Sequence, residues 1–140
     1  MSEFFFYYSK KKIIRQGYGS HITDDITYSF LTEISNVYPP RVYEEENPDE
    51  TVYYVEMPGV KHKQDINAIL DEEVLKVKAK PERLEYIGHS KTDKIKEYRI
   101  ALKLPEGIKP EDIKIKFLED KGILIIRVKK RKKSREIPIE

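Results

Sequence analysis

The residue types that most often carry chemistry in proteins are few in this chain and lie far apart. Its 140 residues include no cysteine, and its three histidines lie in turns or loops without a carboxylate or cysteine at the spacing of metal ligands. No nucleophile-elbow motif is present, and the six glycines form no phosphate-binding loop. We therefore predict that the protein is not an enzyme and holds no metal or cofactor. The histidines His21, His62 and His89 are expected to be solvated surface residues.

Apolar side chains gather instead at the two ends of the chain. Five aromatic residues follow one another near the N-terminus, and two isoleucines flank a proline near the C-terminus. Burying one such side chain is worth roughly 1.5–3 kcal/mol, so both groups should meet other protein surfaces. We predict that the aromatic group contacts another protein or the N-termini of other copies. The aromatic group is Phe4, Phe5, Phe6, Tyr7 and Tyr8, and the C-terminal group is Ile137, Pro138 and Ile139.

The C-terminal group has the spacing of a short strand. Ile137 and Ile139 point to one side of an extended backbone, and Pro138 restricts that backbone before any partner is bound. The preceding sequence KKRKKS is predicted to be an extended, self-repelling tether that reaches another subunit. Its cations could instead bind nucleic acid or an anionic membrane. The body of the chain is slightly acidic, however, which favours the tether.

The composition indicates one domain with extensions. Charged residues make up 37% of the chain and hydrophobic residues 39%, which suits a modest core under an ionic surface. The first residues, MSEFFFYYSKKKII, lack the order of a secretory signal, and no apolar run approaches the ~20 residues that span a bilayer. We predict a cytoplasmic protein without stable membrane insertion and without nucleic acid as a partner.

Residues 1–40 differ from the rest of the chain and are predicted to form an N-terminal arm. They contain most of the aromatic residues but equal numbers of acidic and basic side chains, which argues against a lipid-facing patch. An arm of this length is too short to be a domain, so its aromatic residues are expected to meet a partner or other copies. Apolar residues at helical spacing predict a helix over residues 23–36. These residues are Ile22, Ile26, Phe30 and Ile34.

Residues 41–128 carry the pattern of short strands. TVYYVEM is rich in β-branched and aromatic residues, while VLKVKAK and DIKIKF alternate apolar and polar residues. Turn-forming residues such as Pro58-Gly59 and Asp120-Lys121-Gly122 separate the strands. Short strands, short connections and no long helix predict an all-β antiparallel sandwich, followed by an extended C-terminal tail over residues 129–140.

One connection within this region is longer than a hairpin needs. Residues 81–94, PERLEYIGHSKTDK, contain the apolar piece LEYIG, which could form a strand. A strand on so long a loop cannot easily pair with its own sheet. We therefore predict that it pairs with the edge strand of another subunit.

The order and spacing of several motifs resemble those of one known family. The motifs are Met57-Pro58-Gly59-Val60, Leu104-Pro105, Gly122-Ile123-Leu124 and the C-terminal Ile137-Pro138-Ile139. Together with the strands between them, they make residues 41–128 look like the α-crystallin domain of the small heat-shock proteins, in an archaeal-like form. This resemblance implies an immunoglobulin-like sandwich and a chaperone that holds unfolding proteins without ATP.

The resemblance also implies how subunits assemble. It implies dimers that exchange the strand on the long loop, and large homo-oligomers closed by an I-x-I tail docked in a groove of a neighbouring subunit. The dimer interface would include Leu84, Tyr86, Ile87 and Arg99, of which Arg99 resembles the family's strand arginine. The groove would lie between two strands and would be lined by Ile66, Ala68, Leu70, Ile113, Ile115 and Phe117.

Two other functions remain open at this point. A similar sandwich occurs in monomeric co-chaperones that lack the I-x-I tail, so the chain could be a binding module for a defined protein partner. The basic tail could also belong to a nucleic-acid-binding protein. The tail motif and the long loop favour the oligomeric chaperone, whose partners would be copies of itself and non-native client proteins. The clients would be bound largely by Phe4, Phe5, Phe6, Tyr7 and Tyr8.

Overall fold

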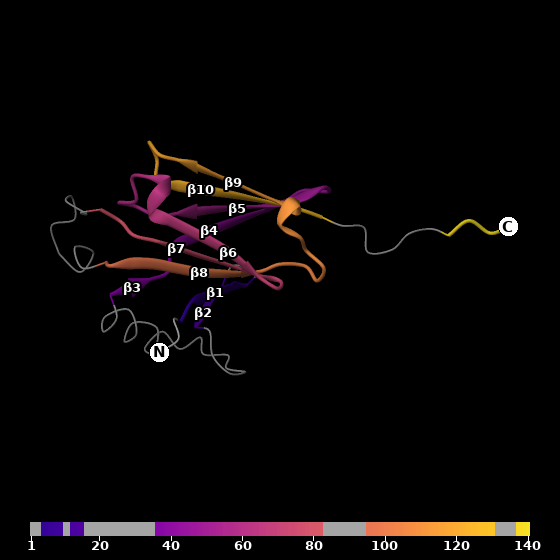
Figure 1. Ribbon diagram of the computed structural model, residues 1–140, viewed down its shortest axis with the longest axis horizontal. Coiled ribbons are helices and arrows are strands. Elements are labelled where there is room, and N and C mark those ends of the chain that lie inside the picture. Colours follow the sequence, from indigo (N-terminus) through magenta and orange to yellow (C-terminus); the bar gives the residue numbers. More distant parts are fainter. Residues whose placement is uncertain (1–3, 10–11, 16–35, 83–94, 131–136) are drawn as a thin grey trace.

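Two β-sheets packed face to face form the part of the chain that the computed structural model describes (Figure 1). This part comprises residues 4–9, 12–15, 36–82, 95–130 and 137–140. The predicted β-sandwich is confirmed. Residues 23–35 of the predicted helix, and the strand predicted within residues 84–87, lie outside the described residues.

The smaller sheet, sheet B, has four antiparallel strands in the order β4-β5-β10-β9. Each strand alternates between side chains that face the other sheet and side chains that face away from it, as the period of two requires. In β10, for example, Leu124, Ile126 and Val128 are buried, while the residues between them are more exposed. The strands are β4 (Arg41–Glu46), β5 (Glu50–Glu56), β9 (Ile113–Leu118) and β10 (Ile123–Lys129).

The larger sheet, sheet A, combines strands from the predicted sandwich with strands from the N-terminal arm. Its order is β2-β1-β8-β7-β6, and the short β3 also pairs with β8. The pairs β6–β7, β7–β8 and β1–β2 are antiparallel, whereas β1 and β3 both run parallel to β8. The strands are β1 (Phe6–Ser9), β2 (Lys12–Arg15), β3 (Val37–Tyr38), β6 (Ile66–Asp71), β7 (Val74–Ala79) and β8 (Glu97–Lys103).

The N-terminal aromatic residues were expected to meet a partner or other copies, but β1 packs them against the sandwich of their own chain. Phe6 pairs with Ile100 and Tyr8 with Leu102, and all four side chains are buried in the core. The physical reason is the period of two: Phe6 and Tyr8 fall on the core-facing side of β1, where they cover the edge of β8. Three segments of the predicted N-terminal arm, β1, β2 and β3, are therefore strands of sheet A.

The core lies between the two sheets. Val55 of β5, Ile100 of β8 and Ile126 of β10 are fully buried. The rings of Tyr8 and Tyr53 meet edge to face across the sheets, with centroids 6.1 Å apart. The hydroxyl of Tyr98 donates a hydrogen bond of 2.6 Å to the carbonyl oxygen of Pro58, which joins β8 to the turn after β5. These contacts hold β1 and β8 over β5.

The turn before β10 depends on a glycine. Gly122 has a φ of +67°, and a Cβ atom at this position would lie 3.2 Å from the carbonyl oxygen of Met57. The backbone N–H of Met57 donates a hydrogen bond of 2.9 Å to the carbonyl of Gly122. Gly107 also has a positive φ, of +83°, but nothing lies within 4 Å of its Cβ position.

We predict that Gly122→Ala destabilises the sandwich more than Gly107→Ala does. Both substitutions place a side chain in the left-handed region, which costs roughly 1–2 kcal/mol. Only Gly122→Ala also forces a contact with the backbone next to β5, so its loss should be larger by about 1 kcal/mol. Urea unfolding of the two variants measures the difference. Equal losses would show that the close approach of Met57 is relieved without cost.

Candidate protein-interaction surfaces

The strands β6 and β9 are the edge strands at one end of sheet A and of sheet B, respectively. All six residues predicted to line a groove lie on the core-facing sides of these strands, because each is in register with a buried residue of the neighbouring strand. On β6 the partners are Ala79, Val77 and Leu75; on β9 they are Val128, Ile126 and Leu124. The six residues are Ile66, Ala68 and Leu70 on β6, and Ile113, Ile115 and Phe117 on β9.

These edge positions leave apolar surface uncovered. The first and last of the three residues on each strand are partly buried against the core. The middle residues, Ala68 on β6 and Ile115 on β9, are exposed, and Ile115 has 41% of its surface exposed. An edge strand also presents unpaired backbone groups along its free side. The two edges therefore offer apolar side chains and free hydrogen-bonding groups to an extended segment of protein.

The C-terminal isoleucines do not cover these edges within their own subunit. Ile137 is 79% exposed and Ile139 is 98% exposed, and the C-terminal end lies well away from the sandwich (Figure 1). The tail begins at a fixed point, since the backbone N–H of Lys130 donates a hydrogen bond of 2.9 Å to the carbonyl of Asp49. The Lys130 Nζ lies 2.6 Å from a carboxylate oxygen of Glu46, and this hydrogen bond lowers the pKa of Glu46.

The five N-terminal aromatic residues differ in how much of their surface is available. Phe5, Phe6 and Tyr8 are buried, while Phe4 and Tyr7 are partly exposed. The rings of Phe4 and Phe6 meet edge to face at 5.5 Å. In this arrangement another protein could contact only the exposed parts of Phe4 and Tyr7. Contact with all five residues requires β1 to leave β8.

Arg99 of β8 holds the start of the N-terminal strand. Its Nε donates a hydrogen bond of 2.8 Å to Glu97, and its Nη1 donates one of 3.3 Å to the backbone carbonyl of Phe4. The guanidinium also lies over the Phe4 ring, 5.3 Å from the centroid. These contacts leave only 16% of the Arg99 side chain exposed. The role predicted for Arg99 at a dimer interface stays a prediction, and the other predicted interface residues, Leu84, Tyr86 and Ile87, lie outside the described residues.

Strand β4 forms the other edge of sheet B and pairs only with β5 among the described strands. Its middle residue, Tyr43, is 50% exposed. Glu44 is in register with Tyr53, and Glu46 follows on the same side of β4. Burial of Tyr53, together with these two carboxylates, raises the pKa of Tyr53 to about 12. This edge is open to pairing with a strand from another chain.

The described residues contain no cluster of histidine, aspartate and glutamate side chains that could hold a metal ion. Of the three histidines, only His62 is described, and its Nε2 lies 3.4 Å from a carboxylate oxygen of Glu82, with both side chains exposed. None of the helices among the described residues is both long enough and apolar enough to cross a membrane.

Several solved structures share the fold of this chain. HSP18.5 from E. histolytica aligns with a TM-score of 0.55 at 16% identity, covering 74% of this chain and 98% of its own. Heat shock protein 16.0 from Schizosaccharomyces pombe aligns at 0.52 with 21% identity, covering 73% and 98%. A point mutant of hsp14.1 from Sulfolobus solfatataricus P2 aligns at 0.54 with 20% identity, covering 88% and 100%. At these identities the likeness shows the fold.

A family model provides the evidence of relationship. The model described as "Hsp20/alpha crystallin family" matches residues 43–140, which include both edge strands and the C-terminal isoleucines. No curated protein matches the sequence. Because the family model covers well over half of the chain, the protein belongs to the Hsp20/alpha crystallin family, as its sequence motifs predicted.

Proposed function

We propose that the protein is an ATP-independent chaperone of the cytoplasm, which binds non-native proteins and suppresses their aggregation as a large homo-oligomer built from strand-exchanged dimers. Membership of the family of small heat-shock chaperones supports the chaperone role. One observation carries the proposal: the same chain has uncovered apolar positions on two edge strands and two exposed isoleucines on its tail. Neither set of apolar residues is fully covered by the part of its own chain that the structure describes, and each set can bury the other in a neighbouring subunit.

The spacing of the tail matches that of the edge strands. Alternate residues of an extended chain lie about 6.6–6.8 Å apart on one side, so Ile137 and Ile139 can contact apolar side chains that are themselves two residues apart, such as Ile113 and Ile115. Pro138 lowers the entropy lost on binding, because its φ is already restricted. Burying two isoleucines should leave a net gain of roughly 2–4 kcal/mol after ordering costs.

A single contact of this strength is weak, but a particle contains many of them. Once one tail has docked, the next subunit is held nearby and its tail binds at a high effective concentration. The open edge of β4 supports the dimeric building block, since it can accept the strand predicted within residues 84–87 of a partner. Dimers joined by tails then form the larger assembly.

The N-terminal aromatic residues are proposed to bind clients when β1 leaves sheet A. Release would expose Phe5, Phe6 and Tyr8 together with the edge of β8 against which they pack. Aromatic side chains offer a large apolar area per contact, which suits the exposed apolar surface of an unfolding protein. No nucleotide is needed, because binding and release follow from burial alone.

Neither alternative function gains support from the structure. For a basic-tailed nucleic-acid-binding protein, the structure bears only on the first cations of the tail: Lys130 is paired with Glu46, while Arg131, Lys132, Lys133 and Arg135 lie outside the described residues. A monomeric binding module would leave the exposed side chains of Ile137 and Ile139 without a partner surface.

Replacing both Ile137 and Ile139 by serine is predicted to dissociate the particle towards dimers. The circular dichroism spectrum should be unchanged, because neither side chain contributes to the core. Light scattering after size-exclusion chromatography measures the mass, and Glu140→Ser is the matched control, since it alters an exposed tail residue without removing apolar surface. A double variant that keeps the wild-type mass would show that the tails do not close the particle.

Replacing residues 81–94 by a tight turn is predicted to convert those dimers into folded monomers. The experiment is performed in the variant that lacks both tail isoleucines, so that dimers are the starting state. Sedimentation velocity then reports whether the remaining contact depends on the long loop. Persistence of dimers at micromolar concentration would refute strand exchange through residues 84–87.

Locking β1 to β8 is predicted to weaken protection of a client. Tyr7 and Ala101 are in register on adjacent strands, and the chain has no cysteine, so Tyr7→Cys with Ala101→Cys can form one defined disulfide. The oxidised form should protect a heated model substrate less well than the same protein after reduction, because the aromatic residues cannot be released. Equal protection by both forms would contradict client binding by a released β1.

A further inference from the structure

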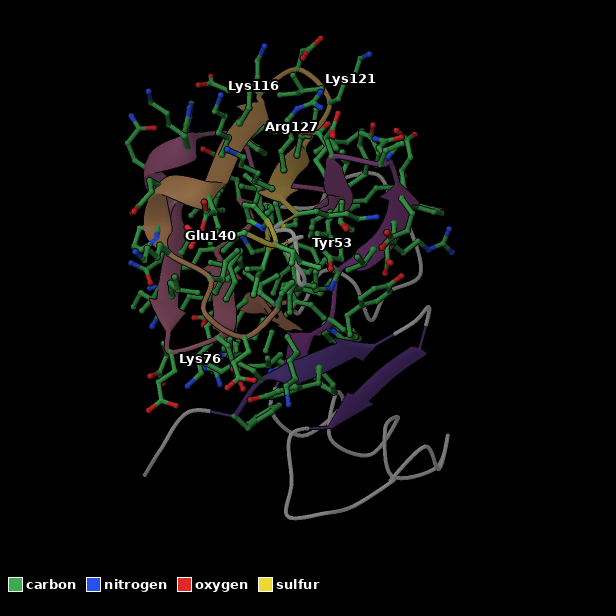
Figure 2. The ribbon with its side chains drawn as sticks, turned by 90° about the vertical axis from the view of Figure 1, so that its right-hand side faces the viewer. Tyr53, Lys76, Lys116, Lys121, Arg127 and Glu140 are labelled. Carbon is green, nitrogen blue, oxygen red and sulfur yellow. The ribbon has the colours of Figure 1, made fainter. Side chains whose placement is uncertain are left out.

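The face of sheet B that points away from sheet A has its own chemical pattern. The registers of β9, β10, β5 and β4 align its side chains in rows that cross all four strands. Figure 2 shows Lys116 and Arg127 on this outward side, with Lys76 of sheet A on the opposite side of the molecule. Taken from β9 to β4, the central row is Lys116, Ile125, Tyr54 and Tyr43, and the next row is Lys114, Arg127, Val52 and Glu45.

The middle of this face is apolar. Ile125 and Tyr54 are directly opposite each other and are partly exposed, and Tyr43 continues their row at 50% exposure. Val52, in the next row, is on the same face but has only 1% of its surface exposed, so it adds little to the surface that a partner could contact. Three strands, β10, β5 and β4, therefore present a continuous row of apolar and aromatic residues that no described element of the chain covers. Contiguous apolar surface of this kind commonly marks an interaction site.

Charge divides the same face into two halves. The half formed by β9 and β10 is basic, and Lys114 and Arg127 are directly opposite each other, a like-charge arrangement that disfavours the sheet. The half formed by β5 and β4 carries most of the acidic residues, and one of them, Glu50, binds Arg127 at 2.7 Å. The basic residues are Lys114, Lys116, Arg127 and Lys129; the other half contains Glu45, Glu50, Glu56 and one cation, Arg41.

A face with an apolar middle and two oppositely charged halves is complementary to itself. Consider a second copy stacked face to face on the first and related to it by a two-fold axis that runs parallel to the strands, midway between β10 and β5. This axis places β9 of one copy over β4 of the other and keeps each row of residues over the same row. Lys114 then faces Glu45 of the second copy, and Ile125 faces Tyr54. Lys129 faces Glu50 in the same way. A two-fold axis across the strands would instead place β9 over β9 and bring like charges together, so complementarity selects the first arrangement.

We propose that two copies of this chain stack through the outward faces of sheet B, related by the two-fold axis that places β9 over β4. The contact area follows from the strand spacing: four strands and about three rows cover roughly 400 Å² per copy, or about 800 Å² in total. An interface of this size is weak by itself. Between copies that other contacts already hold together, however, the effective concentration is high enough for this weak interface to form. The stacking is therefore an additional contact, separate from the edge and tail contacts of the proposed function.

The stacking contact does not compete with those other contacts. The tails are proposed to bind the edges β6 and β9 on their core-facing side, and the exchanged strand is proposed to bind the free edge of β4. The proposed stacking uses only side chains on the opposite face of sheet B. The row at the end of the face, Arg41, Glu56, Ile123 and Leu118, adds no complementary charge pair. The specificity therefore comes from the pairs Lys114–Glu45 and Lys129–Glu50.

Engineered cysteines test the stacking directly in the full-length protein. Lys114→Cys and Glu45→Cys lie three strands apart in one copy, about 14 Å, which is too far for a disulfide within the chain. Mild oxidation should therefore join two copies in the double variant and should join few in either single variant. The control pair, Asn67→Cys and Lys103→Cys, lies on the outward face of sheet A and is also exposed.

Charge reversal provides the second measurement, made on the intermolecular disulfide between Lys116→Cys and Tyr43→Cys, which lie three strands apart in one copy and face each other across the proposed contact. Adding Lys114→Glu or Glu45→Lys alone should lower the yield of cross-linked dimer by about tenfold, because each places like charges together. Combining the two reversals should restore the yield. The proposal is overturned if the sheet A pair cross-links as well as the sheet B pair, or if the combined reversal gives no more product than the single ones.

Discussion

Burial of apolar side chains between two open sheets is the interaction on which the whole molecule depends. Strands with a period of two place Val55, Ile100 and Ile126 where both sheets cover them. The same period continues to the edge strands, where only one side has a neighbour. Ile115 on β9 therefore faces the core side and is still 41% exposed. The uncovered edge is a direct consequence of a sandwich that does not close into a barrel.

The N-terminal strand shows how one such edge can be covered by a segment of the same chain. Strand β1 pairs with β8 and buries Phe6 and Tyr8 against it, and Arg99 fastens the strand through the carbonyl and ring of Phe4. The other edges have no such internal cover among the described residues. The two-isoleucine tail is suited to provide that cover from a neighbouring subunit. In this proposal, assembly completes the burial that folding begins.

Much of this arrangement could be predicted from the sequence, because alternation within a strand is a local property. The strands of residues 41–128 and the core-facing side of Ile66, Ala68 and Leu70 follow from period two and the family motifs. The place of β1 could not be predicted in this way, since Phe4 and Arg99 are 95 residues apart and neither carries a local signal of the other. The divided charge of sheet B likewise depends on which strands are neighbours, and strand order is a property of the tertiary fold.

The most direct test of the central claim is to observe where an isolated tail binds. A peptide with the sequence of residues 135–140 is titrated into the isotopically labelled variant whose own tail isoleucines have been replaced by serine. A net gain of roughly 2–4 kcal/mol corresponds to dissociation constants between about 1 and about 30 mM, which chemical shifts can follow. Shifts centred on the core-facing residues of β6 and β9 are the expected result. Shifts centred on another surface, or none with peptide at about 30 mM, would contradict the proposed use of these edges.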